Sequence, residues 1–138
     1  MNVLFSYDKQ RVDTYDALVE ALPDDAVASP TRSTIPLVSF WADPKTRAAE
    51  FAERLRFDLP ASIELHFEYA VPPPSGRGKA SFTDVMLVAP NVALAIEAKF
   101  TEPKYETVAA WLERGDKQNR ADVFEGWVDV LPENGASS

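Results

Sequence analysis

An α+β fold is predicted for this chain, with helices packed on a small antiparallel sheet. Apolar residues recur at helical spacing within residues 44–56, alternate with polar residues within 63–71, and return to helical spacing after residue 105. Two further apolar runs, 82–88 and 92–100, are separated by only three residues and predict a hairpin. The expected order is therefore a helix, a three-stranded antiparallel meander, and then helices packed on the sheet.

The segments before the first of these strands are shorter. Residues 1–11 predict a short strand or arm, and residues 13–22 carry apolar side chains at helical spacing. Residues 24–34 are rich in small polar residues and predict a surface loop. Asp43 is a favourable N-cap and Pro44 a favourable first helical residue, so a helix is expected to start there.

The strand predicted at 63–71 alternates cleanly, so its odd-numbered residues, including Tyr69 and Val71, are expected to point inward. Residues 72–79 contain three prolines and two glycines and predict an exposed, mobile connection. After it and the hairpin, the helical positions of Trp111 and Trp127 predict core residues. The outward face of the first strand would carry Glu64, His66 and Glu68.

Length and composition predict one globular domain over residues 1–138, with its core at about 35–131 and a disordered tail at 132–138. The chain has 138 residues, of which 46% are hydrophobic, and no cysteine. The absence of cysteine excludes disulfides and thiolate metal sites and favours a cytoplasmic location. No basic leader and no long apolar run is present, so no membrane association is expected.

The net charge of −8 argues against a protein that coats nucleic acid non-specifically, because affinity for phosphate comes chiefly from Lys and Arg. The charge is uneven, however. Residues 71–104 hold four basic side chains against three acidic ones, which leaves −9 for the rest of the chain. An enzyme that holds Mg²⁺ among carboxylates can be acidic overall, since the ion supplies positive charge where phosphate binds.

Three charged residues interrupt the apolar strands of the predicted hairpin: Asp84, Glu97 and Lys99. Charges are rarely left in such places unless they are paired or ligated, because desolvation is costly. Period-two geometry puts Glu97 and Lys99 on one face, and antiparallel pairing brings Asp84 close to Glu97. Two adjacent carboxylates favour a cation between them, and oxygen ligands select Mg²⁺ or Mn²⁺. The alternative is a solvent-facing ion pair of Glu97 with Lys99, with Asp84 at a turn.

Asp84, twelve intervening residues, and then Glu97-Ala98-Lys99 resemble the motif of the PD-(D/E)XK nuclease superfamily. The resemblance implies a restriction-endonuclease-like core, whose helix, three strands and helix match the order predicted from Pro44 onward. That core has a further strand, and no strand is predicted after the last helix. The chain is then a fragment, or residues 1–11 or a partner complete the sheet.

By the same resemblance, Asp84 and Glu97 would bind the metal, the Ala98 carbonyl would be a third ligand, and Lys99 would be the catalytic lysine. The superfamily often adds an upstream acidic residue. Three glutamates are candidates for it, with Glu68 preferred, Glu53 second and Glu50 third.

These observations predict metal-dependent hydrolysis of nucleic-acid phosphodiesters, with Mg²⁺ or Mn²⁺ as cofactor. Nucleic acid is the expected partner, with DNA favoured over RNA, and a homodimer is also considered. Four residues are candidates for contact with nucleic acid: Arg77, Lys79, Lys104 and Tyr105. The alternative is a non-catalytic domain of the same fold that binds nucleic acid or a protein partner.

Overall fold

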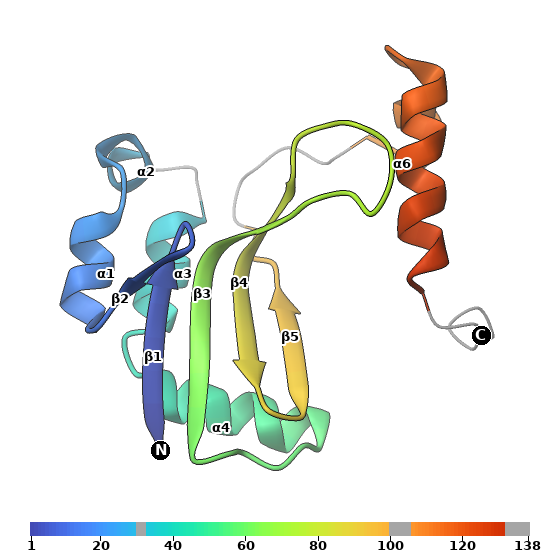
Figure 1. Ribbon diagram of the computed structural model, residues 1–138. Coiled ribbons are helices and arrows are strands. Elements are labelled where there is room, and N and C mark those ends of the chain that lie inside the picture. Colours follow the sequence, from blue (N-terminus) through green and yellow to red (C-terminus); the bar gives the residue numbers. More distant parts are fainter. Residues whose placement is uncertain (30–32, 100–105, 132–138) are drawn as a thin grey trace. The chain divides into compact units, whose positions relative to one another are not determined.

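The structure is a computed structural model that describes residues 1–29, 33–99 and 106–131 (Figure 1). Its five-stranded mixed sheet and accompanying helices confirm the predicted α+β class. The chain divides into two compact units: unit 1 is residues 1–70 and 82–102, and unit 2 is residues 71–81 and 103–138. The predicted disordered tail at 132–138 lies outside the described residues.

The sheet has the strand order β2-β1-β3-β4-β5. Strand β1 (Asn2–Tyr7) pairs antiparallel with β2 (Gln10–Val12) and parallel with β3 (Ser62–Val71). Strand β4 (Ser81–Ala89) lies next to β3, with its arrow reversed in Figure 1, and pairs antiparallel with β5 (Val92–Ile96). The predicted three-stranded meander is therefore present as β3, β4 and β5. The first residues of the chain extend it on the β3 side, and because β1 is parallel to β3 the sheet is mixed, not purely antiparallel as predicted.

The described residues of unit 1 form four helices: α1 (Tyr15–Ala21), α2 (Asp24–Ala28), α3 (Thr34–Phe40) and α4 (Pro44–Leu55). The loop predicted at 24–34 is wrong at its start, where α2 forms instead. Two aspartates in the first turn of α2 suit the positive end of its dipole, and Ala26 is buried. Polar composition alone did not distinguish this short helix from a loop.

Helix α4 starts where the sequence predicted. The Asp43 carboxylate accepts a hydrogen bond from the Thr46 backbone N–H at 3.3 Å, and Pro44 occupies the first turn. Hydrogen bonds from the Thr46 side chain and backbone lower the pKa of Asp43. The helix ends at Arg56, which adopts a left-handed conformation (φ 58°), and it buries Ala48 on its inner face.

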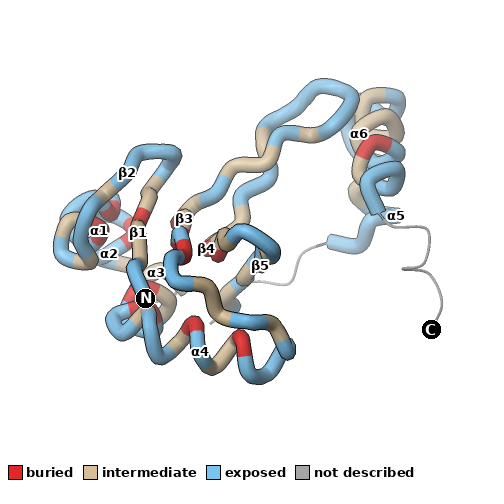
Figure 2. The backbone as a smooth tube through the Cα atoms, turned by 60° about the horizontal axis from the view of Figure 1, so that its bottom comes forward, coloured by how far each residue is buried: buried red, intermediate tan, exposed pale blue. Residues whose placement is uncertain are grey.

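The core of unit 1 lies between the helices and one face of the sheet, as the buried positions on α4, β3 and β4 in Figure 2 show. Trp41, at the end of α3, is fully buried and stacks on Phe51 of α4 with ring centroids 5.8 Å apart. The strand residues of this core are Phe5, Ile63, Leu65, Phe67, Val85 and Leu87.

Strand β3 changes its alternation at Glu68, whose φ of 54° lies in the left-handed region. Before this point Leu65 and Phe67 are buried, as predicted. After it Tyr69 is 36% exposed, and its ring packs edge-on against His66 with centroids 5.5 Å apart. The prediction that Tyr69 points inward is therefore wrong, because the backbone at Glu68 turns it to the face that carries His66.

Unit 2 contains the short helix α5 (Val108–Leu112) and the longer helix α6 (Lys117–Asp129). Thr107 and Asp116 act as their N-caps, each accepting a hydrogen bond from a backbone N–H three residues later. Both helices were expected from the spacing of apolar residues. None of the helices in the described ranges is long and apolar enough to cross a membrane.

Candidate functional site

The first candidate residue, Asp84, lies near the start of β4 on the face of the sheet opposite the core. Val85 and Leu87 are fully buried in that core, and successive side chains of a strand point to opposite faces. Asp84 and Met86, which alternate with them, are half-buried. We call this side of the sheet the open face, and it carries Glu64, His66, Asp84, Met86, Ala93, Ala95 and Glu97.

The register of β4 and β5 runs toward Asp84 and Glu97. Val85 is paired with Ile96 and Met86 with Ala95. Continuing this antiparallel register by one residue places Asp84 across from Glu97, with both side chains on the open face. The predicted juxtaposition of the two carboxylates is therefore consistent with the strand pairing.

A hydrogen bond joins Asp84 to the chain just beyond β5. The backbone N–H of Ala98 donates to Asp84 Oδ2 at 2.7 Å. Strand β5 itself ends at Ile96, so the strand predicted at 92–100 is too long. Beyond the end of β5, the backbone N–H of Ala98 is therefore bonded to the Asp84 side chain and not to the backbone of a neighbouring strand.

Lys99 lies beside Glu97, as the sequence predicted. Its Nζ is 3.8 Å from Glu97 Oε2, and both side chains are 47% exposed. An ion pair with this exposure contributes only about 0–1 kcal/mol, because water screens both charges. Both charged groups are accessible from solvent.

Glu68, the preferred third acidic residue, acts electrostatically on Tyr7 of β1. After burial, the negative charge of Glu68 is the largest influence that raises the pKa of the Tyr7 hydroxyl. Tyr7 lies on β1, which neighbours β3 on the side away from β4. Glu68 therefore combines a left-handed backbone conformation with a carboxylate charge that acts on Tyr7.

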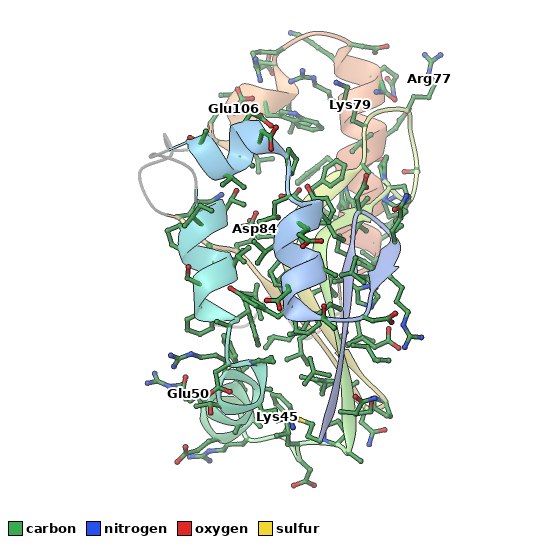
Figure 3. The ribbon with its side chains drawn as sticks, turned by 90° about the vertical axis from the view of Figure 1, so that its left-hand side faces the viewer. Lys45, Glu50, Arg77, Lys79, Asp84 and Glu106 are labelled. Atoms are coloured by element: carbon green, nitrogen blue, oxygen red, sulfur yellow. The ribbon has the colours of Figure 1, made fainter. Side chains whose placement is uncertain are left out.

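The two alternative acids on α4 are separated from Asp84 by the sheet. Glu50 forms an ion pair with Arg47 at 2.8 Å, and Glu53 is exposed. Helix α4 packs on the core face through Ala48, whereas Asp84 lies on the open face. Figure 3 shows the Glu50 and Asp84 side chains well apart. Across the described ranges, no three His, Asp or Glu side chains gather as a metal-binding group.

The connection between β3 and β4 is held against α6, in contrast to the predicted mobile segment. The Ser75 hydroxyl donates to the Asp122 carbonyl at 2.6 Å. The Asn119 side chain accepts from the Arg77 N–H at 2.6 Å and donates to the Arg77 carbonyl. A Cβ on Gly76 would lie 2.7 Å from Val123. The backbone at Arg77 is thus fixed, while its side chain extends outward in Figure 3.

Of the other residues predicted to contact nucleic acid, the structure describes only Lys79. Lys79 is exposed at the end of the same connection. Lys104 and Tyr105 lie outside the described residues.

One feature of unit 2 was not predicted from the sequence. Trp111 and Trp127, expected in the core, are only half-buried, and with Phe124 they line a cavity of about 690 Å³. The spacing of apolar residues marks an inward helix face but does not show whether that face is filled. Charged side chains also line the cavity: Lys79, Glu106 and Arg114.

Comparison with known protein families identifies a matching family model. A family model described as "Domain of unknown function (DUF6946)" matches residues 11–138. No curated protein and no solved structure matches the chain.

Proposed function

Because the chain belongs to the DUF6946 family of domains of unknown function, we propose a function from the candidate site itself: metal-dependent hydrolysis of nucleic-acid phosphodiester bonds. The observation that carries the proposal is the hydrogen bond from the Ala98 N–H to Asp84 at 2.7 Å, which holds the segment after Ile96 beside Asp84, in line with the register of β4 and β5. The order of α4, β3, β4, β5 and the later helices supports a restriction-endonuclease-like core.

The donor set fits Mg²⁺ or Mn²⁺. Mg²⁺ in proteins is held by one or two carboxylates and keeps several waters, so it does not require a third acid. Asp84 uses one oxygen for the Ala98 N–H, and its other carboxylate oxygen is a candidate ligand. Ala93 and Ala95 lie on the same face of β5, and their small side chains would not crowd a bound ion.

In this mechanism Asp84 and Glu97 hold the cation, with the Ala98 carbonyl as a further candidate ligand. The bound ion supplies Lewis-acid stabilisation of charge on a phosphate oxygen. The Lys99 ammonium lies 3.8 Å from Glu97 and is half-exposed, so it can turn toward a phosphate and neutralise developing charge. Glu97 is then left free to bind the cation.

Cleavage of single- and double-stranded DNA and of RNA, each with Mg²⁺, Mn²⁺ or EDTA, tests the proposal. Asp84→Asn and Lys99→Ala should each abolish metal-dependent cleavage and leave the far-UV circular dichroism spectrum unchanged. Glu64→Gln is the matched control, because Glu64 lies on the same face and bonds His66 at 2.9 Å. Full activity in either site variant would refute the assignment.

The second candidate function is non-catalytic binding, in which the contacts of Asp84 and Glu97 only stabilise the fold. Asp84 already accepts a backbone hydrogen bond and Glu97 already faces Lys99. A non-catalytic domain that binds nucleic acid or a protein partner would have this arrangement. It predicts binding that EDTA does not change, with no cleavage of any substrate.

A further inference from the structure

The cavity of unit 2 is bounded by the β3–β4 connection on one side and by α5 and α6 on the other. Its volume of about 690 Å³ lies within the range of about 300–1,000 Å³ that is usual for small-molecule sites. All residues that line it belong to unit 2.

Three aromatic side chains form part of the walls. Trp111 comes from α5, and Phe124 and Trp127 come from α6. The Arg120 guanidinium lies 4.9 Å from the centre of the Trp111 ring and donates a hydrogen bond to the Trp111 carbonyl. Trp111 is therefore fixed from outside the cavity, and a ligand ring would meet an ordered surface.

The walls are also held together before any ligand binds. Gly126 of α6 packs so closely on Ser75 that an added Cβ would lie 2.4 Å from the Ser75 hydroxyl. Together with the Asn119 bonds to Arg77, this contact fixes the connection against the helix. A preformed cavity saves the ordering cost that binding would otherwise carry.

The charges at the cavity favour an anion. Arg114 and Glu106 form an ion pair with each other, so their charges offset. Lys79 makes no ion pair within the described part of the chain. The three charged lining groups sum to +1 in a chain of net charge −8. A purely apolar ligand would leave Lys79 unused, and a cation would be repelled by it.

We propose that this cavity binds a planar aromatic ring that carries a negative charge, with the ring against Trp111 and Trp127 and the anionic group at Lys79. Two sources share this chemistry: a mononucleotide, through its base and phosphate, and a free aromatic carboxylate. The proposal does not depend on phosphodiester hydrolysis, because it uses none of Asp84, Glu97 and Lys99. It shares only Lys79 with the residues predicted to contact nucleic acid.

The three tryptophans supply the readout. In a ¹H–¹⁵N correlation spectrum of the full chain, each indole N–H gives one signal, and Trp41, fully buried in unit 1, is the internal reference. The probes are adenosine monophosphate, adenosine, 2-naphthoate and inorganic phosphate. At least one of the two aromatic anions should shift the Trp111 and Trp127 signals and leave the Trp41 signal in place. Whichever anion binds more tightly identifies the source.

Substitutions separate the ring from the charge. Lys79→Met keeps the apolar stem of the side chain. It should weaken the affinity for the anionic probe about tenfold and leave the affinity for adenosine unchanged. Trp127→Leu should weaken every ring-containing probe. Lys117→Met is the matched control, because Lys117 lies on α6, pairs with Glu113 at 2.8 Å and does not line the cavity.

Three results would overturn the proposal. One is that no probe shifts the Trp111 and Trp127 signals at millimolar concentration. Another is that Lys79→Met and Lys117→Met lower the affinity for the anionic probe equally. The third is that adenosine binds as tightly as the anionic probes, which would remove the role of Lys79. Since Lys79 is exposed, its variant is expected to fold normally, so the test does not depend on Trp127→Leu.

Discussion

Asp84 Oδ2 accepts a hydrogen bond from the backbone N–H of Ala98 at 2.7 Å, just beyond the end of the β4–β5 pairing. The carboxylate proposed to hold a metal therefore also fixes the backbone between Glu97 and Lys99. Substitution can separate these two roles, because an asparagine keeps an acceptor oxygen but carries no charge. The same distinction decides between a metal site and a purely structural contact.

Thermal melts of the wild type, Asp84→Asn and Asp84→Ala provide the first prediction. Without metal, Asp84→Asn should melt near the wild type. Asp84→Ala leaves the Ala98 N–H without its acceptor and should lose about 1 kcal/mol, or roughly 4 °C. At ten times its dissociation constant, Mg²⁺ or Mn²⁺ should stabilise the wild type by about 1.4 kcal/mol and both variants by much less.

If repulsion between Asp84 and Glu97 alone set the stability, the metal-free variants would be more stable than the wild type. Both variants would then melt above the wild type, because either substitution removes one of two facing charges. The Ala98 hydrogen bond and the nearby Lys99 ammonium oppose that gain. Equal metal-induced shifts in the wild type and Asp84→Asn would show that the ion does not bind here.

A pair of glycine substitutions tests the contact between the β3–β4 connection and α6. Alanine is favoured over glycine in a helix by about 1 kcal/mol, yet a Cβ at Gly126 would lie 2.4 Å from Ser75 Oγ and 3.0 Å from its backbone N. Gly126→Ala should therefore lower stability by about 1–3 kcal/mol in urea unfolding. Gly78→Ala is the control, because no atom lies within 4 Å of its added Cβ. Comparable losses in both variants would contradict close packing at Gly126.

The salt dependence of nucleic-acid binding tests Arg77 and Lys79. Neutralising both should weaken binding and reduce the slope of log K against log salt by up to about 1.8 for a duplex, if each contacts one phosphate. Lys45→Ala with Arg54→Ala removes the same charge from exposed positions on α4 and should leave the slope nearly unchanged. Arg77→Ala alone isolates the phosphate contact from the cavity that Lys79 lines. Identical slopes for all variants would exclude the connection from phosphate binding.

The ionisation of Tyr7 gives a prediction for alkaline pH. Burial and then the charges of Glu68, Asp8 and Asp25 raise the pKa of Tyr7 above its ordinary value of 10.0. Its contribution to stability is therefore complete below pH 10 and is lost as the pH rises through the folded-state pKa. Tyr7→Phe should flatten the loss of stability above pH 10, as measured by urea unfolding at a series of pH values.

The same titration reports the position of Glu68. Glu68→Gln removes the largest charge effect and should lower the pKa of Tyr7 toward its ordinary value, measured by tyrosinate absorbance and assigned by difference from Tyr7→Phe. Glu64→Gln, on the same strand, should leave it unchanged. If the two glutamine variants titrate alike, Glu68 does not lie close to Tyr7.

Local patterns were enough to predict the elements that depend on local rules. Helix α4 follows from an N-cap, a proline in the first turn and one apolar stripe, and the β4–β5 hairpin follows from two apolar runs and a short turn. The change of alternation at Glu68 could not be read in this way, because a single positive φ leaves no signature in the hydrophobic pattern of 63–71.

The candidate site shows the same division. The expectation that Asp84 lies opposite Glu97 follows from strand period and turn length, and the observed register of β4 and β5 is consistent with it. The Ala98 bond does not, since it depends on where β5 stops. The cavity around Trp111 and Trp127 was also hidden, because it requires the β3–β4 connection to pack on a helix more than forty residues later along the chain.

The path of the chain through its two units has a consequence for folding order. The chain leaves unit 1 at residue 71, returns at 82 and leaves again at 103. The bond from Ser75 to Asp122 closes a loop of 47 residues, which in an unstructured chain costs about 3 kcal/mol in entropy. Prior folding of β4 and β5 shortens that loop, so unit 2 is expected to assemble after unit 1. For the same reason no single cut separates the units: a fragment that ends at residue 102 keeps residues 71–81 but loses the helices on which they pack.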